Sequence, residues 1–232
     1  MRREVRMLEF LTGPMLVASL CIFFAGLALR ALLYFRGLDQ KLDRVAYTHY
    51  IGSGLKGAAA SIVKWIVPFA SRGWRAAIPT AIPFILLHLG AVLLPFFLLG
   101  HTIVLEDVTG IALPALPMRL ADVLTFLAIF GLLIYIGRRV MLAHVSILTT
   151  GQDWYVLLIT LFVFLSGAFA RFNLAGYDTW LLLHVLSGEI LLITAPFTKF
   201  SHIILFFCSR AQIGMDFAIK RGGRERGAAF PW

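Results

Sequence analysis

The sequence predicts an all-α membrane protein with five transmembrane helices, and three observations lead to this fold class. Of the 232 residues, 60% are hydrophobic and only 14% are charged, which lies outside the usual range of soluble domains. The apolar residues gather into five runs, each long enough to cross the ~30 Å hydrocarbon layer as a helix. Lys and Arg gather between these runs, where they act as topology and lipid-headgroup signals. We therefore interpret the formal charge of +9 as membrane-related and expect no nucleic-acid partner.

The predicted spans follow one another with short connections, except after the first. They cover residues 10–35, 78–100, 120–137, 154–170 and 179–208. We expect the first run to stay as an anchor, because it is too long for the core of a signal peptide and no A-x-A cleavage site follows it. Residues 1–208 then form one five-span membrane domain, and residues 209–232 form a basic tail.

The longest predicted extramembrane piece is 36–77, between the first two spans. Within it, GLKGAAASIVKWIVPFA mixes Lys56 and Lys64 with Val63 and Trp65. This mixture suits an amphipathic helix that lies in the plane of the membrane interface. An ordinary connector is the alternative, since the apolar pattern is short.

The distribution of positive charge predicts the orientation of the spans. Five spans place the two termini on opposite sides, and the segments on one side carry fourteen Lys and Arg against five on the other. The richer side is expected to be cytoplasmic. We therefore predict the N-terminus outside and the C-terminus in the cytoplasm, although the basic lead MRREVR favours the opposite orientation.

The last predicted span carries two histidines on one helical face. His184 and His202 are eighteen residues apart, which makes about five whole turns and roughly 27 Å of rise in an α-helix. One face then offers an imidazole near each side of the membrane, where an ionisable side chain marks a functional site by default. Gly188 lies one turn after His184, and its missing side chain admits a flat, bulky group. We interpret this helix as the ligand helix for two stacked haems; the alternative is two histidines bonded to neighbouring helices.

The second predicted span supplies two further histidines, His88 and His101. They are thirteen residues apart, about 220° around an ideal helix, and would therefore face different ways. Pro95 lies between them and must bend or break the helix, so a kink could bring His101 back into phase; a solvated histidine at the span end is the alternative. With the predicted topology, His88 and His202 lie nearer the cytoplasm, while His101 and His184 lie nearer the outside. Each pair can clamp one haem between facing helices.

Several short motifs carry a family resemblance. They are LDR at 42–44, HLG at 88–90, GH at 100–101, RR at 138–139, TTGQD at 149–153, LLLHVLSG at 181–188 and PFTKFSH at 196–202. In this order they resemble the gamma subunit of respiratory nitrate reductases, a five-span dihaem cytochrome b. The region 51–77 and the tail piece GMDFAIKRGG are more similar to the cytochrome b subunits of transmembrane redox complexes of sulfate reducers, of the Hmc, Tmc and Dsr types.

The resemblance implies two haem b groups with bis-histidine ligation, one at His88/His202 and one at His101/His184. It implies an electron-transfer subunit of an oxidoreductase complex of anaerobic respiration, in the inner membrane of a bacterium. Its partners would be a menaquinone pool, periplasmic multihaem cytochrome c and other membrane subunits, and a cytoplasmic iron–sulfur subunit similar to heterodisulfide reductase.

Two features depart from the family's pattern. The step from His88 to His101 is longer than in the family, and Arg119 stands roughly where the family has a lysine near its quinone site. Because reduced quinone releases protons, we expect its site to open to the outside near the outer haem, with Gly100, His101 and Arg119 as its borders.

Other classes of membrane protein stay open as alternatives. An ion or solute transporter can also place His88, Glu189 and Lys199 in its spans, but the inverted repeats or paired broken helices of transporters are not evident in the sequence. A structural anchor would not need four intramembrane histidines. Glu189 lies about 140° around the helix from His184, where it either relays quinone protons or pairs with a polar group on another helix.

The tail 209–232 is the predicted docking segment. It mixes Phe217, Ile219, Phe230 and Trp232 with Lys and Arg, and aromatic and Arg residues are favoured anchors of protein interfaces. We expect the tail to dock the cytoplasmic iron–sulfur subunit. Binding to anionic membrane lipid is the alternative.

Overall fold

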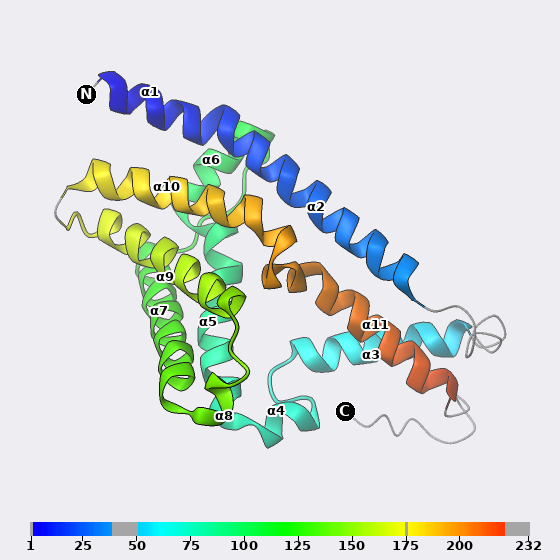
Figure 1. Ribbon diagram of the computed structural model, residues 1–232. Helices are drawn as coiled ribbons and strands as arrows, with labels where there is room; N and C mark the ends of the chain where they lie inside the picture. Colours follow the sequence, from blue (N-terminus) through cyan, green and yellow to red (C-terminus); the bar gives the residue numbers. More distant parts are fainter. Residues whose placement is uncertain (1, 39–50, 175, 221–232) are drawn as a thin grey trace. The chain divides into compact units, whose positions relative to one another are not determined.

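The computed structural model describes residues 2–38, 51–174 and 176–220, and over these residues its regular elements are all helical (Figure 1). Five helical segments are long and apolar enough to cross a membrane by length and composition. They are Arg6–Gly37, Ile78–Phe97, Met118–Met141, Gly151–Arg171 and Tyr177–Phe197. The prediction of an all-α protein with five spans is confirmed, and these helices indicate a multi-pass membrane protein.

The described residues form two compact units. The first comprises the described parts of residues 1–24 and 82–199, and the second those of residues 25–81 and 200–232. The N-terminal helix α1 (Arg2–Phe10) continues through a π-helical turn, η1 (Leu11–Met15), into α2 (Leu16–Gly37). Pro14 lies inside that turn, where its missing N–H removes one bond of the regular helical ladder.

The first unit is built mainly from helices joined by short connections. The helices are α5 (Ile78–Phe97), α6 (Leu99–Thr109), α7 (Met118–Met141), the short α8 (Ala143–Ser146), α9 (Gly151–Arg171) and α10 (Tyr177–Thr194). Helix α9 packs against both α7 and α10. Ion pairs join the two ends of α7 and α9: Arg171 contacts Asp122 at 3.0 Å, and Arg139 contacts Asp153 at 3.8 Å. The two helices therefore run antiparallel.

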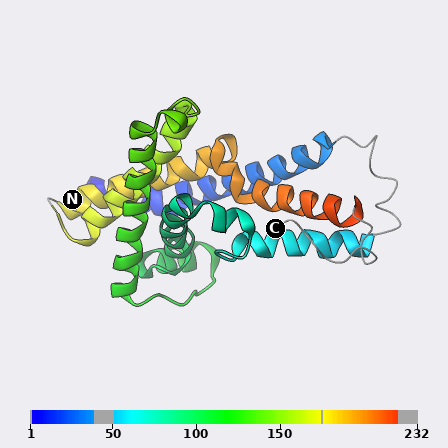
Figure 2. The same cartoon turned by 90° about the horizontal axis from the view of Figure 1, so that it is seen from below.

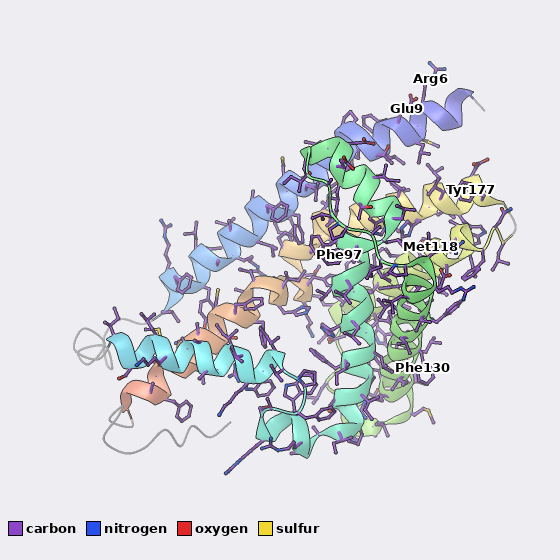
Figure 3. The ribbon with its side chains drawn as sticks, turned by 180° about the vertical axis from the view of Figure 1, so that it is seen from behind. Arg6, Glu9, Phe97, Met118, Phe130 and Tyr177 are labelled. Atoms are coloured by element: carbon purple, nitrogen blue, oxygen red, sulfur yellow. The ribbon has the colours of Figure 1, made fainter. Side chains whose placement is uncertain are left out.

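Small residues bring α5 and α7 into backbone contact. A Cβ added at Gly90 would lie 2.8 Å from the Leu124 carbonyl oxygen, and one at Gly131 would lie 2.8 Å from the Pro83 carbonyl oxygen. Close approach at small residues is the usual way for helices to associate in lipid. Figure 3 shows Phe97, the last residue of α5, and Met118, the first of α7, at the same end of the pair. Large apolar side chains such as Phe130 stay exposed on α7, as expected for a surface that faces lipid.

The second predicted span does not run unbroken to Gly100. Helix α5 ends at Phe97, Leu98 adopts an extended backbone (φ −74°, ψ 132°), and α6 begins at Leu99. The connection between the second and third predicted spans is therefore helical as far as Thr109, which is the last residue of α6. Pro95 lies three residues before this break, in the last turn of α5, where it removes one backbone donor from the helical ladder.

The last predicted span, 179–208, is not a single helix. Helix α10 ends at Thr194, two 3₁₀ turns follow at Ala195–Phe197 (η2) and Lys199–Ser201 (η3), and α11 runs from His202 to Lys220. The prediction that His184 and His202 share one face of one helix is therefore wrong. Pro196 cannot donate the next helical hydrogen bond, and Thr198 is extended.

This break also changes the boundary of the tail. Residues 209–220 belong to α11 rather than to a separate segment. The remainder of the predicted docking tail, 221–232, lies outside the described residues.

The second unit is organised around α3 (Ile51–Ile66) and α11, which lie side by side in Figures 1 and 2. Gly57 and Gly214 meet so closely that a Cβ at either position would overlap the backbone of the other. The Arg210 guanidinium lies 4.8 Å from the Trp65 ring centroid. Trp74, in the short helix α4 (Arg72–Ala76), donates from Nε1 to the Trp65 carbonyl at 3.0 Å. The sequence between the first two spans thus does form a helix, and its position in the membrane interface stays a prediction.

Candidate functional site

Two of the four predicted ligand histidines meet inside the first unit. His101 lies in the first turn of α6, and His184 lies two turns into α10. Their Nε2 atoms are 3.4 Å apart, and their rings are nearly parallel, with an interplanar angle of 4°. The extended backbone at Leu98 separates α5 from α6, so the direction of His101 is set by the start of α6 and not by the helical phase of His88.

Backbone carbonyls orient both imidazoles. His101 Nδ1 lies 2.9 Å from the Leu94 carbonyl oxygen, and His184 Nδ1 lies 3.0 Å from the Val163 carbonyl oxygen on α9. A carbonyl only accepts, so each Nδ1 must donate, and this assigns the tautomer. Each Nε2 then points a lone pair at the other. Two lone pairs at this distance repel unless a cation or a proton lies between them.

Glycines shape the space around the pair. A Cβ at Gly167 on α9 would lie 2.9 Å from Nδ1 of His184, so only glycine leaves room for the ring there. By contrast, a Cβ at Gly100 or at Gly188 would meet no atom within 4 Å. Gly100 precedes His101, and Gly188 lies one turn after His184. Open space therefore lies beside the backbone at Gly100 and at Gly188.

A bis-histidine haem fits this set of donors. Two metal–imidazole bonds of ~2 Å span about 4 Å, a few tenths of an ångström more than the 3.4 Å that separates the Nε2 atoms. Carbonyl groups bonded to Nδ1 are the usual outer partners of metal-ligating histidines. Among the described residues, no group of three or more His, Cys, Asp or Glu side chains gathers that could hold a metal ion.

The other predicted pair is divided between the two units. His88 lies halfway along α5 in the first unit, and its Nδ1 lies 2.8 Å from the Phe84 carbonyl oxygen. Its ring stacks on Phe84 with the centroids 3.7 Å apart. His202 is the first residue of α11 in the second unit and is exposed. The pairing of His88 with His202 stays a prediction.

The predicted borders of the quinone site lie at the starts of two helices. Gly100 and His101 are in the first turn of α6, and Arg119 is an exposed residue in the first turn of α7. That a quinone binds there stays a prediction.

Sequence reasoning missed a polar cluster at the start of α9. Asp153 accepts hydrogen bonds from the Lys199 ammonium at 2.6 Å, and from the backbone N–H and hydroxyl of Thr150 at 2.9 and 2.7 Å. Arg139 lies 3.8 Å from the same carboxylate. A Thr-x-x-Asp capping pattern was readable in TTGQD, but the pairing with Lys199 joins residues 46 positions apart. This ion pair joins the first turn of α9 to the first residue of η3.

Glu189, the acid inside the last span, is almost completely enclosed. Its side chain is 1% exposed. Within the part of the chain that the structure describes, neither carboxylate oxygen has a hydrogen-bond partner. The pairing with a polar group on another helix, which the sequence left open, is therefore not formed among these residues.

Comparison with known proteins found a relative that matches nearly the whole chain. The chain is 55% identical over 226 residues to a protein of Nitratidesulfovibrio vulgaris (strain Hildenborough) that carries only the description "Protein". The alignment covers 97% of this chain and 100% of the relative. No family profile matches the chain, and no solved structure matches it.

Proposed function

The chain belongs to the same family as the Nitratidesulfovibrio vulgaris protein, and we propose that it is the haem b membrane subunit of a respiratory redox complex. The observation that carries this proposal is the pair His101 and His184. Their Nε2 atoms face each other at 3.4 Å across nearly parallel rings, and carbonyl groups fix the tautomer of both imidazoles. A transporter or a structural anchor has no evident use for two aligned lone pairs.

In this proposal His101 and His184 would hold one haem through their Nε2 atoms, and His88 and His202 would hold a second. The first pair rests on the geometry above, while the second rests on the resemblance to dihaem cytochromes b. When bound, haem iron accepts and releases one electron at a time, with a potential that its axial ligands and their hydrogen bonds tune. The carbonyls of Leu94 and Val163 keep the proton on Nδ1, which leaves both Nε2 atoms available as ligands.

The proposed electron path runs between the two sides of the membrane. On one side we place a menaquinone pool or periplasmic cytochrome c partners, and on the other a cytoplasmic heterodisulfide reductase-like iron–sulfur subunit. The excess of Lys and Arg in the segments 36–77, 138–153 and 209–232 supports a cytoplasmic position for them. A bacterial inner membrane follows from these partners.

The proposal also places α3 at the membrane interface. Its small residues Gly57 and Ala58 are buried, while Ile51, Leu55 and Val63 are each more than half exposed. An exposed apolar stripe on a helix that also carries Lys56 and Lys64 suits the boundary between lipid and water.

Absorption spectra of the purified protein and of histidine variants test the proposal. The wild-type protein should show a haem b Soret band and reducible α bands, with two haems per chain. His101→Ala and His184→Ala should each lower this to one haem per chain, because a methyl group cannot ligate iron. His144→Ala is the matched control, since His144 is exposed on α8 and is no proposed ligand. A wild-type protein without haem, or an unchanged haem content in both variants, would exclude the proposal.

A further inference from the structure

Glu189 is a buried acid that the proposed haem ligation does not use. Its side chain is 1% exposed, and neither oxygen has a partner among the described residues. A carboxylate that is removed from water without a partner is far less stable than the neutral acid. Ionisable residues within membrane spans are rare, and those that persist usually serve function.

Neither carboxylate oxygen of Glu189 has a hydrogen-bond partner among the described residues. Helix α10 packs against α9 and also contacts the turns η1 and η2, neither of which carries a titratable side chain. Helix α10 also meets α6, whose His101 faces His184 and whose acids Glu106 and Asp107 are exposed. The titratable residues of α9 are engaged elsewhere: Asp153 with Lys199, Tyr155 with Thr194 and Arg171 with Asp122. On α10 itself, Tyr177 and Asp178 are exposed in its first turn, and His184 bonds to the Val163 carbonyl. The carboxyl group is therefore left to exchange a proton rather than to form an ion pair.

The position of Glu189 relates it to the proposed haem. It follows His184 by five residues on the same helix, which is about 7.5 Å along the helix axis and about 140° around it. Gly188 directly precedes Glu189, and a Cβ at Gly188 would meet no atom within 4 Å. The two side chains therefore do not touch, and a change of one unit charge at the His101–His184 site acts on the carboxylate through space, more strongly in a medium of low dielectric constant than in water.

We propose that Glu189 is a proton-binding group coupled to the electron on the haem that His101 and His184 hold. This inference rests on the proposed function. When one electron arrives from a quinol or an iron–sulfur donor, the Glu189 carboxylate binds one proton from solvent. When the electron leaves, the same O–H bond breaks and the proton is released. One electron and one proton move in each direction, and no other bond forms or breaks.

Redox titration of the haems at a series of pH values tests this coupling. In the wild-type protein, the midpoint potential of the haem lost in His184→Ala should fall by up to ~59 mV per pH unit, the slope of one proton per electron. This slope applies over the pH range in which the carboxyl is ionised in the oxidised protein and protonated in the reduced protein. Glu189→Gln should make the potential independent of pH, and Glu189→Asp should restore a slope. Glu106→Gln is the matched control, because Glu106 is an exposed acid on α6, and it should keep the wild-type slope.

The outcomes separate this inference from the proposed function. Haem bound with the same slope in wild type and Glu189→Gln overturns the coupling and leaves the proposed function standing. A protein without haem overturns both. Infrared difference spectra between the reduced and oxidised states give a second readout. They should contain a carbonyl band of a protonated carboxyl that is absent from Glu189→Gln, and an identical band in that variant would also overturn the coupling.

Discussion

At the scale of single residues, the imidazole of His184 depends on a glycine of the neighbouring helix. A Cβ at Gly167 would lie 2.9 Å from two atoms of that ring, which is held in place by the Val163 carbonyl. Gly167→Ala should therefore push the ring away from His101 and lower severalfold the content of the haem that we propose for this site. Haem quantification and the Soret spectrum of the purified variant measure this effect.

Gly137→Ala is the matched control for that substitution. A Cβ at Gly137 meets no atom within 4 Å, and Gly137 also lies in a membrane-spanning helix. Its haem content should equal that of the wild-type protein. Equal haem content in both glycine variants would contradict the assigned role of Gly167.

At the scale of elements, α3 and α11 depend on the contact between two glycines. Replacing a glycine inside a helix by alanine normally stabilises the helix, by up to about 1 kcal/mol. At Gly57 the added Cβ would overlap the Gly214 backbone, so Gly57→Ala should instead lower the free energy of unfolding by about 1–3 kcal/mol. Thermal unfolding in mild detergent, followed by circular dichroism, measures the change.

Gly52→Ala on the same helix controls for the general effect of alanine. No atom lies within 4 Å of a Cβ at Gly52, so this variant should be as stable as the wild type or slightly more stable. Gly57→Ala is thus expected to lower the unfolding temperature, whereas Gly52→Ala is expected to leave it unchanged or to raise it slightly. A Gly57→Ala protein that unfolds at the same temperature as Gly52→Ala would show that the two helices are not in close contact.

At the scale of the whole molecule, the distribution of charge sets the expected partner surface. Fourteen of the Lys and Arg residues fall in the segments predicted to be cytoplasmic, and the final segment combines Arg221, Arg224 and Arg226 with Phe230 and Trp232. Replacing residues 221–232 by a Gly/Ser segment of equal length should leave the haem spectrum intact. It should also abolish co-purification of the proposed iron–sulfur subunit, because the predicted aromatic and Arg anchors are lost.

Two readouts decide that experiment. Haem absorbance shows whether the membrane domain is intact, and mild-detergent purification shows whether the partner is retained. A stoichiometric partner on the substituted protein would remove residues 221–232 from the docking surface. Reduced binding to anionic vesicles together with a retained partner would favour the lipid alternative.

The sequence by itself determined the fold class and the number of spans. Both follow from local composition, because a segment in lipid must satisfy its own backbone hydrogen bonds and becomes helical wherever it is long and apolar enough. Composition also identified His101, His184 and Glu189 as ionisable residues in or next to apolar spans. Such residues cost free energy in the membrane and therefore mark candidate functional sites. The sequence also identified Pro95 as a place where the second span must bend.

Only the tertiary structure decided how these residues meet. The turn of His101 toward His184 depends on the backbone angles of one residue, Leu98, which a pattern of apolar residues does not encode. The carbonyl of Val163 that orients His184, and the Asp153–Lys199 ion pair, join helices that are distant in sequence. Pro196 could have predicted the end of α10 at Thr194. The residues before and after it are similarly apolar, so hydropathy alone predicted one continuous span. Hydropathy reports the environment of a segment, whereas the direction of each side chain is set by breaks and by contacts between helices.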